Sequence, residues 1–466
     1  MRFLEKAGLV GLGVVAGVSL SLHFAAIADK ETLETPLPVE ELRAFSEVFG
    51  RIKSDYVEPV TDKKLITGAI TGMLNGLDPH SAYLDADAFK ELQVGTHGEF
   101  GGLGIEVGME DGLVKVISPI EDTPAFHAGI KSGDLIIRLD DTLVKGMTLE
   151  DAVKRMRGKP GSTITLTITR KDEPKLLTFT LTRAVIKVQS VKSKLIEPGY
   201  GFVRITQFQE KTGENLASAL EGLFKQNQAD LKGLVLDLRN DPGGLLTGAV
   251  GVSAAFLAKD ALVVYTEGRT EDAKMRLTAS AENYLRGSGS EDYLKKIPDA
   301  VRSVPMVVLV NGGSASASEI VAGALQDHKR AVIMGTQTFG KGSVQTILPL
   351  GNNTAIKLTT ARYYTPGGRS IQAKGIEPDI LVEDPATGHE DGMMHLREAD
   401  LDKHLINDKP SDSKPNNTGK SSLPAAPNNK GGDAAKPAPA EFGSKSDYQL
   451  NQALNLLKGM QILHGK

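Results

Sequence analysis

Apolar and polar residues follow different rhythms along the chain, and each rhythm predicts a different kind of element. From residue 37 to about residue 95, apolar side chains recur every three or four positions, as at Phe45, Val48, Phe49, Ile52 and Tyr56. This spacing gives one apolar face and predicts amphipathic helices. The run Asp78-Pro79-His80-Ser81 breaks this region, and a further short helix is expected over 86–92.

From about residue 97 to residue 183 the period shortens towards two, which predicts strands joined by glycine-bearing turns. Strands are expected around 105–107, 114–117, 164–169 and 177–182. One helix interrupts them: Thr148 can cap it, and Leu149, Ala152, Val153 and Met156 form its inner face.

Two short continuous apolar runs, 234–238 and 306–310, mark a third block between about residues 184 and 384. Runs of this kind are typical of strands that are buried on both faces of an α/β sheet. Helices are expected over 216–224 and 316–327, and 343–348 alternates like a strand. The charged stretch 265–303 is interpreted as a possible insertion.

The end of the chain divides into a polar stretch and a short amphipathic segment. Residues 385–445 are rich in Pro, Asn, Lys, Gly and Ala, which predicts a flexible linker. A terminal helix then carries an apolar stripe of Tyr448, Leu450, Ala453, Leu454 and Leu457. This stripe must be buried against the same chain or against another copy.

The N-terminus has the three parts of a secretory signal: Arg2 and Lys6, an apolar run over 7–26, and the small-x-small exit Ala26-Ile27-Ala28. The run approaches the roughly 20 residues that span a bilayer, so an uncleaved membrane anchor is the alternative. Both interpretations predict export, and the periplasm fits best.

Composition narrows the chemistry. The 54 basic and 58 acidic residues give a net charge of −4, which argues against nucleic acid as the main partner. The chain has 0 Cys, so disulfides, thiol nucleophiles and Cys-ligated zinc are excluded. It also has 0 Trp, which argues against a large aromatic platform for a cofactor. Hydroxyl, carboxylate, amine and imidazole groups remain, and no metal or cofactor is expected.

The segment 311–319, Asn-Gly-Gly-Ser-Ala-Ser-Ala-Ser-Glu, follows a buried strand and opens a helix. Its small residues permit close approach of a ligand, and the free N–H groups of the helix start can stabilise an oxyanion, so a serine here is well placed as a nucleophile. The alternative is structural, because Ser316-Ala317-Ser318-Glu319 also matches a capping box.

Lys341, in Thr338-Phe339-Gly340-Lys341-Gly342, is the candidate base. Burial disfavours an ammonium ion and lowers the pKa of a lysine, so a buried Lys341 could act as a neutral amine, whereas an exposed loop lysine could not. Gln345 follows on the expected strand, where its amide could orient the amine.

Residues 335–341 also match the first seven positions of a phosphate-binding loop, but Gly342 stands where Ser or Thr is required and a strand follows instead of a helix. Nucleotide binding is therefore retained only as an alternative. A further polar turn, 237–244, ends in Gly243-Gly244 and could bring a backbone N–H close to a substrate carbonyl, or could simply be a tight turn.

The segments 237–244, 311–319 and 338–345 together resemble those of the C-terminal processing peptidases, also called tail-specific proteases. These are serine peptidases with a Ser/Lys dyad and a PDZ domain. The resemblance covers roughly residues 37–384. It implies that Ser316 is the nucleophile, that Lys341, 25 residues later, is the base, and that Gln345 orients it. The oxyanion donors would be the N–H of Ala317 and one from Gly243 or Gly244.

The resemblance also assigns the middle block to the PDZ domain. Gly102, Leu103 and Gly104 would form the carboxylate-binding loop, and Ile105 would begin the strand that a substrate tail extends, since an extended peptide can add to a sheet edge. Arg157 is the candidate for coupling ligand binding to activation, with a solvated surface charge as the alternative. His80 is interpreted as structural.

The predicted architecture is multidomain α/β: a signal peptide or anchor (1–28), a helical cap region (35–96), a PDZ domain formed by a small β-sandwich or barrel with helices (97–184), a peptidase core (185–384), a linker (385–446) and a terminal amphipathic helix (447–466). The predicted function is an exported serine endopeptidase that recognises protein tails with apolar C-termini. A non-catalytic PDZ scaffold is the alternative. The expected partners are an activator or adaptor protein and further copies of this chain, bound through the N- and C-terminal helices. The protein would contact the inner membrane only if the N-terminal anchor is retained.

Overall fold

The computed structural model describes residues 37–120, 122–171, 173–287, 291–383, 396–408, 443–444 and 446–464. The predicted signal or anchor segment 1–28 and most of the predicted linker lie outside the described residues. No helix within the described ranges has the length and hydropathy that a membrane span needs.

Residues up to Ile70 form a unit of their own. Helix α2 (Val39–Asp55) occupies most of its described part, and α3 (Asp62–Asn75) begins in it. The helical prediction is confirmed here. The large apolar side chains of α2, however, are exposed, as in Phe45 at 47% and Val48 at 57%.

The block predicted to be rich in strands forms a compact β-domain with its own apolar core. Its sheet has the order β3-β4-β5-β7-β8, with β6 beside β5, and β2 pairs separately with β9. The bounds are β2 (Glu99–Gly102), β3 (Ile105–Glu110), β4 (Leu113–Pro119), β5 (Leu135–Leu139), β6 (Thr142–Leu143), β7 (Thr163–Thr169), β8 (Leu177–Thr182) and β9 (Ala184–Lys187), with helices α5 (Pro124–His127) and α6 (Leu149–Met156). The predicted cap of α6 is confirmed, because the Thr148 side chain accepts a hydrogen bond from the Asp151 N–H.

The following block forms a six-stranded sheet in the order β10-β11-β12-β15-β16-β19, in which only the β10–β11 pair is antiparallel. Its strands are β10 (Val191–Glu197), β11 (Tyr200–Ile205), β12 (Gly233–Asp237), β15 (Met306–Val310), β16 (Val332–Gly335) and β19 (Ile380–Leu381). Every residue of β12 and β15 is buried, as the continuous apolar runs predicted.

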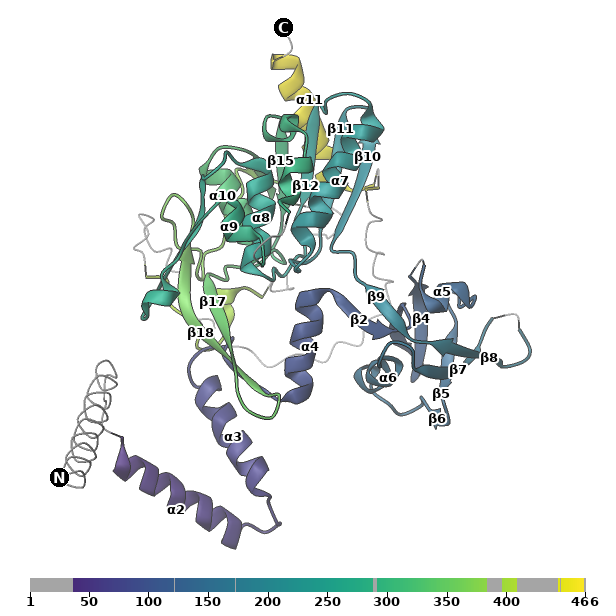
Figure 1. The fold of residues 1–466 in the computed structure, drawn as a ribbon, viewed down its shortest axis with the longest axis vertical. Coiled ribbons are helices and arrows are strands. Elements are labelled where there is room, and N and C mark those ends of the chain that lie inside the picture. Colours follow the sequence, from purple (N-terminus) through teal and green to yellow (C-terminus); the bar gives the residue numbers. More distant parts are fainter. Residues whose placement is uncertain are drawn as a thin grey trace, which may run out of the picture. The chain divides into compact units, whose positions relative to one another are not determined.

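Different helices cover the two faces of this sheet (Figure 1). Alternate residues such as Leu236 and Val308 pack among α7 (Thr212–Asn227), α8 (Leu246–Phe256) and α10 (Ala317–Asp327). Their neighbours Val235 and Val307 pack against Leu450, Ala453, Leu454 and Leu457 of the terminal helix α11 (Tyr448–His464).

Leu450, Ala453, Leu454 and Leu457 of the apolar stripe are therefore buried within their own chain, whereas Tyr448 is 40% exposed. The expectation that this helix mediates homo-oligomerisation is not supported by that stripe, because the sheet already covers it. Because side chains alternate between the two faces of a strand, both faces of this apolar sheet must be covered, one by α7, α8 and α10 and the other by α11.

A second, antiparallel sheet joins distant segments in the order β1-β18-β13-β14, with β17 also paired to β18. Its strands are β1 (Ala82–Leu84), β13 (Leu262–Gly268), β14 (Arg276–Thr278), β17 (Ser343–Pro349) and β18 (Ala355–Tyr364), and α4 (Ala86–His97) follows β1. The strand predicted over 343–348 is thus β17.

Two irregular segments contribute to the folded core. In the stretch 265–303, Tyr284, Leu294 and Val301 belong to the main apolar core, and its interpretation as an insertion stays a prediction. Residues 396–408, predicted to be linker, are packed: Glu398 is fully buried and its N–H donates to the Phe339 carbonyl. Composition misled here because one buried carboxylate and a few backbone bonds fix a segment that has no apolar run.

Candidate active site

Ser316 stands at the junction between β15 and α10, as the N-cap of that helix. Its backbone has φ +54° and ψ −111°, a conformation that residues other than glycine rarely adopt. Such strain is held only by surrounding structure and gathers at functional sites. The loop before it is fixed by Ser314, whose Oγ donates to the Leu238 carbonyl at 2.7 Å.

The capping-box prediction for this helix holds for its glutamate. The Ser316 N–H donates to Oε2 of Glu319 at 2.8 Å. The same carboxylate also accepts the Thr338 hydroxyl at 2.5 Å and the N–H groups of Gly340 at 2.7 Å and Lys341 at 2.9 Å. Burial raises the pKa of Glu319 to about 7, and these four donors oppose that rise.

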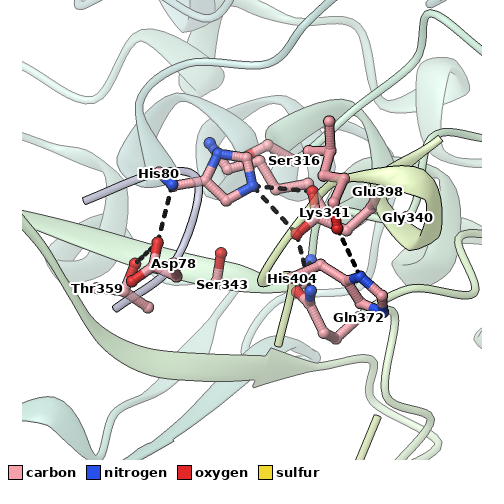
Figure 2. A network of polar contacts seen from close by, with 12 residues as sticks. Asp78, His80, Ser316, Gly340, Lys341, Ser343, Thr359, Gln372, Glu398 and His404 are labelled. Carbon is pink, nitrogen blue, oxygen red and sulfur yellow. Dashed lines mark hydrogen bonds and ion pairs between the residues drawn. The ribbon is translucent and has the colours of Figure 1, made fainter. Parts of the chain in front are cut away.

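Lys341 lies in the loop between β16 and β17, and Figure 2 shows its side chain close to those of Ser316, His80 and Glu398. Burial lowers the pKa of its amine, and Lys357 lowers it further, whereas Glu398, Glu319 and Asp78 raise it. A buried amine is what the sequence required of a neutral base. No hydrogen bond joins Ser316 Oγ to Lys341 Nζ among the described residues.

The turn after β12 lies directly against the nucleophile segment. A Cβ placed on Gly243 would lie 2.7 Å from the Ala315 carbonyl oxygen, 2.8 Å from Ala317 N and 2.8 Å from Ser316 Cβ. A Cβ on Gly244 would instead lie 2.1 Å from the carbonyl oxygen of Phe208. Gly243 is therefore the glycine that borders Ser316 and Ala317, while Gly244 borders Phe208.

Asp241 holds this turn in place and was missed from the sequence. Its carbonyl accepts the Ala315 N–H at 3.0 Å and the Ser318 hydroxyl at 2.9 Å, and its Oδ1 accepts the Gly243 N–H at 2.9 Å. Burial raises the pKa of Asp241 to about 7. The Gly243 N–H is engaged in this state, whereas no hydrogen bond of the Ala317 N–H is found among the described residues. In the sequence, the one indication that Asp241 matters is its place directly after the apolar run 234–238.

Arg239, in the same turn, connects the site to the terminal helix. Its guanidinium group binds the Asp237 carboxylate at 2.8 Å and the Asp447 carboxylate at 2.6 Å, and donates to Gln449 at 2.9 Å. Asp447 precedes α11 and also caps it, by accepting the Leu450 N–H. The last helix of the chain is thus fastened to the turn that carries Gly243.

Gln345 is part of the site region but has other partners. Its side-chain nitrogen donates to Ser343 Oγ at 3.0 Å and to Thr359 Oγ1 at 3.2 Å. No hydrogen bond from Gln345 to Lys341 is found among the described residues, so its role in orienting the amine stays a prediction.

A second polar network surrounds the amine (Figure 2). His80 Nε2 lies 2.8 Å from Glu398 Oε2, and Glu398 Oε1 accepts a bond from Gln372 at 2.8 Å. Gln372 in turn accepts the Gly342 N–H at 3.0 Å, next to Lys341. Glu398 was missed because it lies within the predicted linker.

The nucleotide alternative for residues 335–341 is contradicted. The N–H groups of Gly340 and Lys341, which would have to bind phosphate, donate to Glu319, and the loop leads into strand β17. A buried carboxylate at these donors would repel a phosphate.

In the β-domain, Gly102, Leu103 and Gly104 connect β2 to β3, and Ile105 begins β3, which is the end strand of its sheet. Gly104 needs its positive φ of +76°, and a Cβ there would lie 2.2 Å from Thr123. An end strand with an unpaired edge is the geometry that a peptide can extend.

Arg157 follows α6 as its C-cap and is half-buried, so it is not fully solvated. Its guanidinium group lies 4.8 Å from the centre of the Phe100 ring, and its Nε is buried with no partner among the described residues. Both residues line a cavity of about 660 Å³, together with Leu149, Val153 and Gln209.

A β-domain with an open end strand, followed by an α/β core with a serine at a helix start and a buried lysine, defines the class of serine peptidases with a PDZ domain. The comparisons agree: residues 199–382 match the model of peptidase family S41, residues 101–181 match the PDZ domain, and residues 20–88 match the N-terminal domain of the activating protease CtpB.

The carboxy-terminal-processing protease of Bartonella bacilliformis is 46% identical over 453 residues, which cover 97% of this chain and 96% of that protein. The carboxy-terminal processing protease CtpB of Bacillus subtilis is 34% identical, covering 80% of this chain and 75% of that protein. A solved photosystem II D1 C-terminal processing protease is 32% identical, with a TM-score of 0.41, covering 73% of this chain and 86% of that one. The chain belongs to the carboxy-terminal processing proteases of peptidase family S41 and is a serine peptidase.

Proposed function

We propose that Ser316 and Lys341 are the catalytic dyad of this peptidase. The observation that carries the proposal is that both residues donate their backbone N–H to one carboxylate, that of Glu319, so that their segments converge while the Lys341 amine is buried. A lysine with a lowered pKa supplies a neutral amine that can take the proton of a serine hydroxyl.

In the reaction, Ser316 Oγ attacks the scissile carbonyl carbon as its proton passes to the Lys341 amine. The tetrahedral intermediate collapses when Lys341 returns this proton to the leaving amine, which breaks the peptide bond and leaves an acyl-serine. Lys341 then takes a proton from a water molecule as its oxygen attacks the acyl carbon. The second tetrahedral intermediate collapses when Lys341 gives this proton to Ser316 Oγ, which breaks the ester bond, releases the acid product and restores both the hydroxyl and the neutral amine. Neither metal nor cofactor enters these steps.

The oxyanion of the intermediate is stabilised by the Ala317 N–H at the start of α10 and by an N–H of the Gly243-Gly244 turn. The support is the 2.8 Å approach of the Gly243 Cβ position to Ala317 N. In the same proposal, the Gln345 amide orients the Lys341 amine once substrate is bound.

Substrates are protein chains that end in an apolar tail. The tail adds to β3 from Ile105, and its carboxylate is held by the loop of Gly102, Leu103 and Gly104. Arg157 couples this binding to the core, because it lines a cavity that also includes Gln209 of the core.

The protein acts in the periplasm, after export by a cleaved signal or with an N-terminal membrane anchor. The support is the charged start and apolar run over residues 2–26. An activator or adaptor protein and homo-oligomers through the N-terminal helices complete the proposal, since the apolar face of α2 is exposed within its own unit.

The test is digestion of a disordered reporter with an apolar C-terminus by wild type, Ser316→Ala, Lys341→Met and Lys374→Met. Lys374 is the control lysine, because it is exposed and its carbonyl accepts a hydrogen bond from Gln337 of the same loop at 2.8 Å. We expect cleavage by wild type and Lys374→Met only. Undiminished cleavage by Ser316→Ala or Lys341→Met would contradict the dyad, and tail binding without any cleavage by wild type would indicate a PDZ scaffold.

A further inference from the structure

Glu319 is a buried carboxylate that the chemistry above does not use directly. It lies in the first turn of α10 and its side chain is fully buried. Four donors reach it: the N–H groups of Ser316, Gly340 and Lys341, and the Thr338 hydroxyl.

These contacts exceed what a helix cap needs. In a capping box, the glutamate satisfies one backbone N–H at the start of its own helix. Here only the Ser316 N–H belongs to that helix start, and the other three donors lie 19 to 22 residues further along the chain. The carboxylate therefore bridges two segments, which are also joined nearby by the Phe339 N–H bond to the Ser314 carbonyl at 3.0 Å.

We propose that Glu319 is a positioning residue, whose carboxylate fixes the main chain of the nucleophile Ser316 relative to that of the base Lys341. Oε2 binds both of these N–H groups, at 2.8 Å and 2.9 Å, so the two residues share a single acceptor atom. Oε1 accepts the Thr338 hydroxyl and the Gly340 N–H, and this second attachment prevents the loop 338–341 from rotating about Oε2. This inference rests on the proposed dyad.

The bridge also explains how the strained backbone of Ser316 is maintained. A residue other than glycine at φ +54° persists only when its surroundings over-determine it. The bond from the Ser316 N–H to Glu319 is one such constraint.

Glu319 has an electrostatic effect on the base as well. The charged or titratable groups that influence the Lys341 amine are Glu319, Glu398, Asp78 and Lys357. His80 acts through its contact with Glu398, and the Tyr363 hydroxyl contacts the Lys341 carbonyl. Since ionised Glu319 favours the ammonium form, replacing it with a neutral side chain lowers the pKa of Lys341.

The experiment compares Glu319→Gln and Glu319→Asp with wild type, measuring kcat, KM, the pH profile of kcat/KM and the melting temperature. Gln keeps the shape but presents an NH₂ group to donors. Asp keeps the charge but is too short to reach both segments. The matched control is Asp292→Asn, which removes another capping carboxylate of the core that accepts bonds from Leu294 N–H and Tyr284.

For Glu319→Gln we expect kcat to fall about 100-fold with KM changed less than about threefold, since a misplacement of about 1 Å between reacting groups costs on that order. The acidic limb of its pH profile moves to lower pH. Glu319→Asp loses kcat but keeps the limb at the wild-type position. Asp292→Asn lowers the melting temperature and leaves both kcat and the limb unchanged.

The proposal is overturned if Glu319→Gln keeps kcat within about threefold of wild type, or if its loss of kcat only follows a loss of melting temperature that Asp292→Asn reproduces. If Glu319→Gln does not fold, Glu319→Asp decides, and full kcat in that variant overturns the proposal. Labelling of Ser316 with a fluorophosphonate separates the two hypotheses: an unlabelled, active wild type refutes the dyad, whereas a labelled wild type with active Glu319→Gln refutes only the role of Glu319.

Discussion

Replacing Gly243 with alanine tests the oxyanion site directly. The new methyl group would lie 2.8 Å from Ala317 N, 2.8 Å from Ser316 Cβ and 2.7 Å from the Ala315 carbonyl oxygen. It would therefore occupy the place next to the Ala317 N–H where the oxygen of the substrate carbonyl is proposed to lie.

The magnitude has two parts. Relieving a 2.8 Å contact to an ordinary 3.4 Å requires a shift of about 0.6 Å between the turn and the nucleophile, and loss of an oxyanion donor costs about 10²–10³ in kcat. The φ of +96° adds strain of about 1–2 kcal/mol for a residue with a Cβ. We therefore expect kcat to fall at least about 100-fold, while the fold loses only a few kcal/mol of stability.

The assay measures kcat and KM on the disordered reporter, together with the melting temperature and with binding of an apolar-tail peptide to the β-domain. Gly312→Ala is the matched control, because it lies in the loop before Ser316 and a Cβ there meets nothing within 4 Å. We expect Gly312→Ala to retain kcat and Gly243→Ala to bind the peptide like wild type.

A folded Gly243→Ala that cleaves the reporter within about threefold of the wild-type rate would show that the oxyanion does not lie beside Gly243 and Ala317. The same holds if Gly312→Ala loses as much activity, because the effect would then come from loop rigidity. Equal losses of kcat and peptide binding would place the defect in folding.

Three further predictions concern the parts that support the site. Leu457→Ala empties a fully buried position between α11 and the sheet and should cost about 3 kcal/mol in chemical denaturation; an unchanged midpoint would show that the helix is not docked. Asp447→Asn removes one charged partner of Arg239 and should lower both the melting temperature and kcat; unchanged kcat would separate the terminal helix from the turn. Burial raises the pKa of Glu319 and Asp241 to about 7 from ordinary values of 4.5 and 3.8. The folded chain therefore holds these two protons more tightly than the unfolded chain, which stabilises the fold. This contribution to the free energy of unfolding is complete below about pH 4 and is lost as pH rises through 7. Calorimetry should show a melting temperature that falls between pH 5 and 8, less steeply in Asp241→Asn, and a rising one would contradict this.

Local patterns predicted most of the elements correctly. The apolar runs 234–238 and 306–310 became β12 and β15, and the alternation over 343–348 became β17. Burial of a strand on both faces needs only a continuous apolar run, and a helix cap needs only residues three apart, so each is encoded within a few positions.

The segments of the site could also be recognised, but not their contacts. Small residues before a helix indicated Ser316, and glycines around Lys341 indicated a tightly packed loop. The strained φ of Ser316, the choice of Gly243 over Gly244 as its neighbour, and the support from Asp241 depend on how two separate turns meet.

Local patterns were enough to predict the alternating faces of the central strands, the helix that begins at Ser316 and the apolar stripe of the last helix, because each depends on neighbours within one or two turns. The packing of the folded chain set what covers that stripe and which segment of the predicted linker binds His80 beside Lys341. It also set the contacts that Glu319 makes across 22 residues and Arg239 across 208. Such contacts are set by packing and by the need of buried charges for partners, which no local pattern of residues records.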